Sequence, residues 1–174
     1  MSEYFLAMDF AAFAHGEQKF PGKQYSYIVH IAEVAAETMN IIFREEVSNP
    51  TLSIQCAILH DTLEDTNITY EEVLNKFGLE VANGVKALTK NLSLEKNLQM
   101  QDSLDRLKLE PKEVQLVKLA DRITNLQEPP NYWTKEKIKQ YNDEAKLIYE
   151  TLKSSSKYGS NRLKQKIEEY KKYE

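Results

Sequence analysis

Residues 57–66 read AILHDTLEDT. On a helix of about 3.6 residues per turn, four apolar positions in and before this stretch share one narrow face, which we expect to be core: Leu52, Cys56, Leu59 and Leu63. Four ionisable side chains fall within an arc of roughly 140° on the other side: His60, Asp61, Glu64 and Asp65. If buried, this face needs a cation to offset its negative charge. A solvated acidic helix end is the alternative, and it is the commoner case for an isolated His-Asp pair.

A second histidine and a further aspartate stand in apolar surroundings elsewhere in the chain. His30 follows the residues YIV, and Asp121 lies within VKLADRITN, residues 117–125. Taken singly, His30 is explained as a core histidine bonded to backbone, and Asp121 as an ion-pair partner of Lys118 or Arg122. Two imidazoles and two carboxylates together suit Mn²⁺, Fe²⁺ or Zn²⁺ better than Ca²⁺. The sequence therefore predicts one divalent cation with coordination positions left for water and substrate, held by His30, His60, Asp61 and Asp121.

Helical periodicity recurs along the whole chain, and strand-like alternation is hard to find. Asn49-Pro50, the capping-box pair Thr69 and Glu72, and Thr134 indicate helix starts. We expect helices over about 3–15, 26–46, 50–64, 70–78, 79–89, part of 91–110 after Ser93, 111–126, a long one after Thr134, and 160–173, with a break at Ser154–Ser156 and Gly159. The predicted fold is all-α: a compact helical bundle formed by residues 1–174 as one domain, with a core over about 3–153 and a C-terminal helical extension over about 160–173.

The composition is that of an ordinary globular protein, with 174 residues, 41% hydrophobic and 29% charged. A formal net charge of −4 argues against a nucleic-acid polymer as partner, because phosphate backbones demand clustered cations. The only cysteine, Cys56, cannot form an internal disulfide, and the first residues, MSEYFLAMDF, lack the features of a signal peptide. No apolar run approaches the roughly 20 residues of a membrane span. We expect a cytoplasmic protein without a membrane partner; the oligomeric state is left open.

These stretches together resemble the hydrolase domain of the RelA/SpoT family, which belongs to the HD superfamily of phosphohydrolases. The matching segments follow in the same order along the chain: AHGEQ at 14–18, YIVH at 27–30 with Val34-Ala35, AILHDTLEDT at 57–66, Phe77-Gly78, LTK at 88–90, and VKLADR at 117–122 with Asn125. So many ordered matches are far more specific than a lone His-Asp pair.

The resemblance implies an all-helical Mn²⁺ enzyme that removes the 3′-pyrophosphate from guanosine tetra- and pentaphosphate. It implies metal ligation by His30, His60, Asp61 and Asp121, in agreement with the donor set above. Glu64 and Asp65 correspond to the acidic pair that positions and activates water. Lys90, Asn125 and Tyr141 correspond to nucleotide contacts, although Tyr141 also lies on an apolar helical stripe and could be core. The expected partner is a small phosphorylated nucleotide.

The chain departs from the family pattern in the loop before the first metal histidine. The family loop usually carries an arginine-lysine run, whereas residues 18–24 read QKFPGKQ. Lys19 and Lys23 are the remaining candidates for phosphate contacts, and for His15 we favour a packing role over metal ligation. These departures concern the substrate, so an HD nucleotidase that releases orthophosphate is an alternative. A non-catalytic scaffold is a weaker alternative, because all four ligands and both acidic residues are present.

Overall fold

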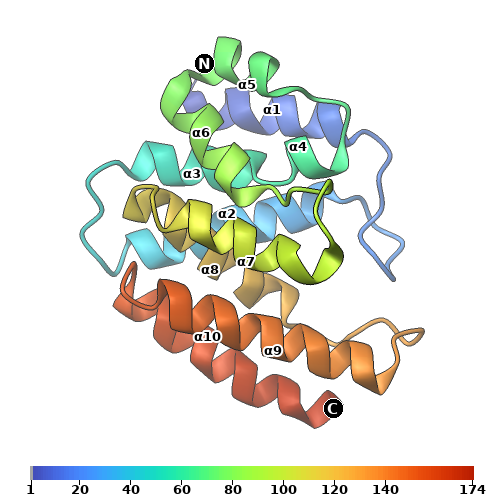
Figure 1. Cartoon of the computed structure of the whole chain (residues 1–174). Coiled ribbons are helices and arrows are strands. Elements are labelled where there is room, and N and C mark those ends of the chain that lie inside the picture. Colours follow the sequence, from blue (N-terminus) through green and yellow to red (C-terminus); the bar gives the residue numbers. More distant parts are fainter. Residues whose placement is uncertain (1) are drawn as a thin grey trace.

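The computed structural model describes residues 2–174, and within this range the chain forms helices joined by loops, with no named strand (Figure 1). The predicted all-α class is therefore confirmed. The helices are α1 (Glu3–His15), α2 (Ile28–Ile42), α3 (Pro50–Leu59), α4 (Thr62–Asp65), α5 (Tyr70–Phe77), α6 (Leu79–Leu88), α7 (Lys96–Leu107), α8 (Lys112–Asn125), α9 (Lys135–Leu152), α10 (Lys157–Tyr170) and the 3-10 turn η1 (Lys171–Tyr173).

The helix starts follow the capping signals of the sequence. The Asn49 side chain accepts a hydrogen bond from the Leu52 N–H at 3.1 Å, with Pro50 in the first turn of α3. Thr69 and Glu72 form the predicted capping box of α5. Thr134 accepts from the Lys137 N–H at 3.2 Å and caps α9. Each cap satisfies a backbone donor that has no partner inside its helix.

Two of the expected helices are shorter than predicted. The helix expected over 26–46 spans only Ile28–Ile42. The helix expected over 50–64 ends at Leu59 and is followed by the single turn α4. The Thr62 hydroxyl donates to the Leu59 carbonyl at 2.7 Å, and Asp61 has a ψ of −1°, which turns the chain out of the helical path. The single face inferred for 57–66 is therefore two faces that meet at a corner.

The last helix begins earlier than the sequence indicates. Ser156 adopts an extended backbone and accepts from the Gly159 N–H at 2.8 Å, so α10 starts at Lys157. Gly159 lies inside the first turn rather than in the predicted break. Leu163, Ile167 and Tyr170 are buried, and α10 packs against both α8 and α9.

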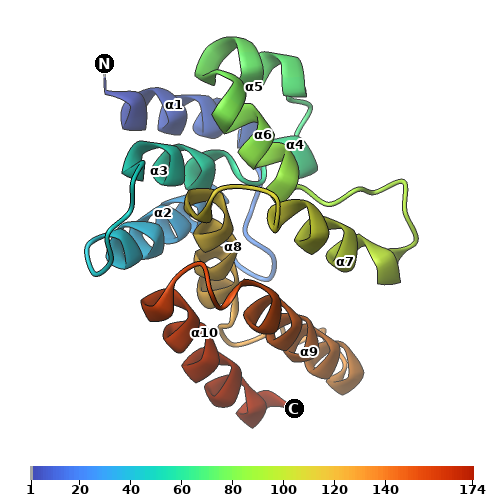
Figure 2. The same cartoon turned by 60° about the vertical axis from the view of Figure 1, so that its left-hand side comes forward.

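The helices α2 and α8 form the centre of the molecule (Figures 1 and 2). On one side, α3 packs against α1, α2 and α8, while α5 and α6 lie beyond it. On the other side, α9 and α10 run next to each other and cover α8. This layering brings the start of α2, the corner between α3 and α4, and the second half of α8 to one region. Within residues 2–174, no helix combines the length and apolar character needed to cross a bilayer.

Candidate active site

Three buried side chains from different helices converge where α2, α3 and α8 meet. His30 lies in the first turn of α2, His60 directly follows α3, and Asp121 is in α8. One potential ligand atom from each lies within 4.8 Å of the other two. The residues are 1%, 3% and 7% exposed, respectively. The spacing and donor types are those of a divalent metal site.

The orientation of His60 follows from a hydrogen bond on the far side of its ring. Its Nδ1 lies 2.8 Å from the carbonyl oxygen of Ala57, one turn earlier in the chain. Nε2 therefore faces the carboxylates, 2.8 Å from Asp61 Oδ2 and 3.7 Å from Asp121 Oδ1. A ring whose Nδ1 is held by a backbone carbonyl, so that Nε2 faces a group of carboxylates, is typical of a metal-binding histidine.

The structure argues against the simpler explanation for His30. A core histidine would bond the backbone, but His30 Nδ1 has no hydrogen-bond partner within residues 2–174. Its Nε2 lies 3.7 Å from Asp61 Oδ2 and 3.6 Å from Asp121 Oδ1. Both imidazoles therefore face the same two carboxylates, and this nitrogen and oxygen donor set fits a divalent transition metal.

The two aspartates are held by different neighbours. Asp61 Oδ2 accepts the Tyr27 hydroxyl at 2.6 Å, and Asp61 lies outside the mutual 4.8 Å group although it is close to both rings. Asp121 Oδ1 accepts from the Asn125 amide at 2.5 Å, and its Oδ2 lies 3.3 Å from Lys118 Nζ. The ion pair expected from the sequence for Asp121 is thus present with Lys118. This ion pair leaves room for a metal, because Lys118 engages only the Oδ2 atom of the Asp121 carboxylate.

Burial and mutual charge set the ionisation of this cluster. Burial disfavours the charged ring of His60, but the negative charges of Asp61 and Asp121 outweigh it and raise the pKa of His60 to about 10. Burial also opposes ionisation of Asp61, yet the neighbouring His60 holds the pKa of Asp61 below its usual range. Burial and the Asp61 carboxylate together raise the pKa of the Tyr27 hydroxyl, so this group stays a proton donor. The two aspartates draw positive charge to this spot, whether it comes from a proton or from a metal ion.

The acidic pair on α4 sits beside the cluster in two different environments. Glu64 Oε1 pairs with Lys90 Nζ at 2.8 Å, and Glu64 Oε2 accepts the Lys90 backbone N–H at 2.9 Å. Asp65 Oδ2 accepts from the Gln18 amide at 3.2 Å. Partial burial, followed by the charge of Asp61, raises the pKa of Asp65. Burial lowers the pKa of Lys90, but Glu64 outweighs this and raises it overall.

A cavity of about 470 Å³ opens next to Asp65. The 16–27 loop forms one wall, where Lys19 and Ser26 pair through their backbones, and the loop from Asn125 to Trp133 forms another. Tyr141 and Tyr170 close the cavity from α9 and α10. The predicted nucleotide contacts Lys23, Asn125 and Tyr141 all line it. Lys19 does not line it and is exposed, so its predicted contact finds no support in this arrangement.

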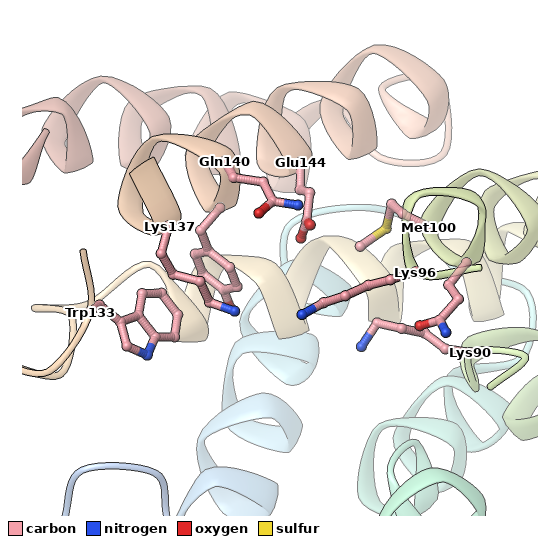
Figure 3. Close-up of a pocket in the computed structure, with 9 residues that line it drawn as sticks. Lys90, Lys96, Met100, Trp133, Lys137, Gln140 and Glu144 are labelled. Atoms are coloured by element: carbon pink, nitrogen blue, oxygen red, sulfur yellow. The ribbon is translucent and has the colours of Figure 1, made fainter. Parts of the chain in front are cut away.

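A smaller pocket of about 190 Å³ adjoins the cavity, because Trp133 and Tyr141 line both. Three lysines contribute to it, and we call it the lysine pocket: Lys90, Lys96 and Lys137, with Gln99, Met100, Trp133, Gln140, Tyr141 and Glu144. Figure 3 shows Lys96 and Lys137 extending from α7 and α9 toward the same space, with Trp133 at one side. Lys137 Nζ lies 5.1 Å from the centre of the Trp133 ring.

Tyr141 is packed against core residues and also lines both cavities, so its nucleotide contact stays a prediction. Its ring packs under the buried Arg122 guanidinium at 4.1 Å and meets Trp133 edge-to-face at 5.1 Å. One part of the ring is therefore core, and another part is exposed to both cavities. Sequence reasoning missed Lys96 and Lys137, because exposed lysines are frequent and nothing in the local pattern marks these two. The only tryptophan of the sequence, Trp133, was the one residue nearby that could have pointed to a binding surface, and it lines both cavities.

Comparison with known proteins agrees with this geometry. The family described as HD domain matches residues 7–159. Guanosine-3′,5′-bis(diphosphate) 3′-pyrophosphohydrolase MESH1 of Xenopus tropicalis is 31% identical over 155 residues, which cover 86% of this chain and 84% of the relative. The Mus musculus protein of the same name is 30% identical, covering 94% and 92%. Guanosine-3′,5′-bis(diphosphate) 3′-pyrophosphohydrolase of Aquifex aeolicus is 33% identical, and the match covers 94% of this chain but 23% of that protein.

Solved structures show the same fold. One described as a metazoan ortholog of SpoT that hydrolyses ppGpp aligns with a TM-score of 0.84 at 25% identity, covering 97% of this chain and 96% of the other. A second, from Listeria monocytogenes, aligns with a TM-score of 0.65 at 18% identity over 85% of this chain and 99% of the other, which speaks for the fold alone. The resemblance inferred from the sequence motifs is confirmed.

Proposed function

The chain belongs to the HD domain family, and from this membership we propose that it is a metal-dependent phosphohydrolase that removes the 3′-pyrophosphate from guanosine 3′,5′-bis(diphosphate). The observation that carries the proposal is the buried group of His30, His60 and Asp121 next to a nucleotide-sized cavity that Asp65 lines. The names of the relatives and of the aligned solved structure support the same reaction.

His30, His60, Asp61 and Asp121 would hold the cation, with Mn²⁺ preferred and Fe²⁺ or Zn²⁺ also compatible with the donor set. A divalent cation bound there supplies Lewis acidity, which lowers the pKa of a bound water and offsets charge developing on the phosphate. Tyr27 and Asn125 orient the two aspartates through their hydrogen bonds at 2.6 Å and 2.5 Å. Such bonds keep carboxylates in the geometry that ligation requires.

Asp65 is the general base. Water attacks the phosphorus bonded to the 3′-oxygen, Asp65 takes a proton from this water, and the bond between phosphorus and the 3′-oxygen breaks. The products are pyrophosphate and guanosine 5′-diphosphate. The 3′-oxygen takes a proton from solvent and Asp65 returns its proton to solvent, so one water is consumed. Asp65 suits this role because Gln18 engages only one of its oxygens, whereas Lys90 engages both oxygens of Glu64. Glu64 holds Lys90 at the edge of the lysine pocket.

The two adjoining cavities suit the two parts of such a nucleotide. Lys23, Asn125 and Tyr141 contact the nucleoside in the larger cavity, next to the metal site. Lys90, Lys96 and Lys137 neutralise phosphate oxygens in the lysine pocket, where ammonium groups act as mobile point charges. Lys19 is exposed and lines neither cavity, so it would act on the substrate only as a more distant positive charge.

We also assign the protein to the cytoplasm. The unpaired Cys56 thiol is buried in the core, which suits a reducing compartment. A nucleotide substrate that carries several phosphates is also confined by membranes, so its hydrolase acts where it is made.

The test uses purified protein, guanosine 3′,5′-bis(diphosphate) and Mn²⁺, with separate detection of pyrophosphate and orthophosphate. We expect pyrophosphate release that EDTA abolishes and that His60→Ala lowers to background. Orthophosphate release from mononucleotides instead would identify a phosphomonoesterase. Turnover that survives both EDTA and His60→Ala would rule out the metal mechanism.

A further inference from the structure

The residue that holds Asp65 in place comes from the loop after α1, far from α4 in sequence. The Gln18 amide nitrogen lies 3.2 Å from Asp65 Oδ2, and its amide oxygen lies 2.8 Å from His15 Nδ1. His15 is 5% exposed, and its ring packs against the Tyr27 ring at an angle of 30°, with the ring centres 4.9 Å apart. The motif residues His15 and Gln18 have no part in the reaction described so far.

The chemistry of the three groups fixes the direction of the hydrogen bonds. An ionised carboxylate only accepts, so the Gln18 NH₂ group must face Asp65. The Gln18 carbonyl then faces His15, and the His15 Nδ1 must carry a proton to donate to it. The protons thus point from His15 to Gln18 and from Gln18 to Asp65. A glutamate in place of Gln18 has the same shape but no proton to donate at neutral pH.

The backbone of this loop is built to hold Gln18 in register. Gly16 has a φ of 48°, a backbone conformation that residues with a side chain rarely adopt. It ends α1 with a tight turn. The Gln18 N–H then donates to the His15 carbonyl at 2.9 Å, and the Gln18 carbonyl accepts the Tyr27 N–H at 2.8 Å. The backbone of Gln18 is therefore held by these two hydrogen bonds, and its side chain is held by His15, independently of Asp65.

We propose that Gln18, with its amide oriented by His15, is a positioning residue that turns Asp65 so that one carboxylate oxygen stays free to accept the proton of the attacking water. This role rests on the proposed function. It requires that Gln18 act on turnover rather than on substrate affinity, although its side chain also lines the larger cavity. Tyr27, at the end of the same loop, donates a hydrogen bond to Asp61. The loop therefore orients both Asp61 of the proposed cation site and the proposed base Asp65.

The experiment compares steady-state kinetics of pyrophosphate release in loop variants of the full chain. Gln18→Met removes both hydrogen bonds at similar length, and Gln18→Glu replaces the donor with a second carboxylate. We expect kcat to fall about 10- to 100-fold in both, with KM changed by less than about 3-fold. Glu17→Gln, an exposed neighbouring substitution that also introduces an amide, should match the parent protein.

The His15 variants separate positioning from packing. The amide nitrogen of His15→Asn can replace Nδ1 as donor, so this variant should keep kcat within about 5-fold of the parent. His15→Leu fills a similar buried space without a hydrogen-bond donor. Its kcat should fall by about as much as that of Gln18→Met. Thermal unfolding and Mn²⁺ titration of each variant report on folding and on the cation site independently of turnover.

A direct readout of the bond direction is ¹⁵N NMR of histidine-labelled protein. In the parent, the His15 signals should show a proton on Nδ1 that exchanges slowly with water, and Gln18→Met should speed this exchange. Unchanged kcat in Gln18→Met, a rise confined to KM, or a His15 ring without a proton on Nδ1 would each overturn the role of Gln18. A parent protein that releases no pyrophosphate would instead contradict the proposed function.

Discussion

At the scale of single residues, Glu64 and Asp65 show how adjacent carboxylates on one turn of helix acquire different hydrogen-bond environments. Glu64 forms two hydrogen bonds with Lys90, one through the side chain and one through the backbone. Asp65 forms one, with Gln18, and faces the larger cavity. Both Glu64 oxygens are therefore occupied, whereas Asp65 keeps an oxygen that could accept a proton from water.

This contrast predicts different kinetic effects for matched amide substitutions. Asp65→Asn should lower kcat about 10²- to 10⁴-fold, the range typical for loss of a general base. Glu64→Gln should act mainly on KM, because it weakens the hold on Lys90 but leaves the base intact. Steady-state assays of pyrophosphate release measure both. An equal collapse of kcat in Glu64→Gln would reassign the base.

At the scale of helices, Arg122 connects the metal-site helix to the wall of the cavities. Its guanidinium lies 4.1 Å from the Tyr141 ring centre and 3.4 Å from the Glu144 carboxylate, so α8 and α9 are joined through a buried charge. This contact aligns Tyr141 and, one turn before it, Lys137 with the site that Asp121 belongs to. The lysine pocket therefore depends on how α9 packs against α8 and α7.

Removing a lysine of this pocket should weaken substrate binding without slowing the chemistry. Lys96→Ala and Lys137→Ala should each raise KM about 3- to 10-fold and leave kcat nearly unchanged, since each removes one point charge from a solvated site. Lys139→Ala, an exposed α9 variant outside the pocket, is the control. The effect should shrink as salt is added. If KM for both pocket variants matches that of the control, the phosphates bind elsewhere.

The contact of α6 with α3 and α8 depends on a missing side chain. A Cβ at Gly84 would lie 2.7 Å from Cys56 Sγ and 2.9 Å from a Val114 methyl group, both in buried residues. Helix propensity favours alanine over glycine by about 1 kcal/mol, but overpacking typically costs about 1–3 kcal/mol. Val114 is stiff, so we expect overpacking to win.

Gly84→Ala should therefore lower the free energy of unfolding by up to about 2 kcal/mol. Urea unfolding followed by circular dichroism measures it. Ala82→Gly, in the same helix and also buried, isolates the propensity and small-cavity contributions, and it should destabilise too. Stabilisation by Gly84→Ala would mean that the helices separate easily at this contact.

At the scale of the whole molecule, the proposed cation site joins helices from three parts of the chain. Its donors come from α2, from the corner after α3 and from α8, so a bound cation links segments that separate on unfolding. A ligand that binds only the folded state stabilises it by about 2.7 kcal/mol at 100 times its Kd. For a chain of this size that corresponds to a rise of roughly 5–10 °C in Tm.

Adding Mn²⁺ to chelator-treated protein should produce this rise, and Asp121→Asn should remove most of it. Differential scanning calorimetry measures both, and Lys139→Ala should respond like the parent. A metal-independent Tm in the parent would contradict a cation site that joins these helices.

The sequence by itself determined the helical class and predicted the cluster of His30, His60 and Asp121, which could hold a divalent cation. Helical periodicity and caps such as Asn49 and Thr134 are local, because a helix satisfies its hydrogen bonds within a few residues. The ordered motifs around His30, His60 and Asp121 identified the family, since their residue types and order are properties of the chain. The structure brings these three together as expected.

Only the tertiary structure decided how the chain uses these residues. The corner at Asp61, the pairing of Glu64 with Lys90, the lysine pocket and the bond from Gln18 to Asp65 all depend on packing between distant segments. Local propensity carries no information about such contacts, because each partner is an ordinary polar residue in its own segment. Their roles arise when folding excludes water and leaves each polar group only one or two neighbours to bond.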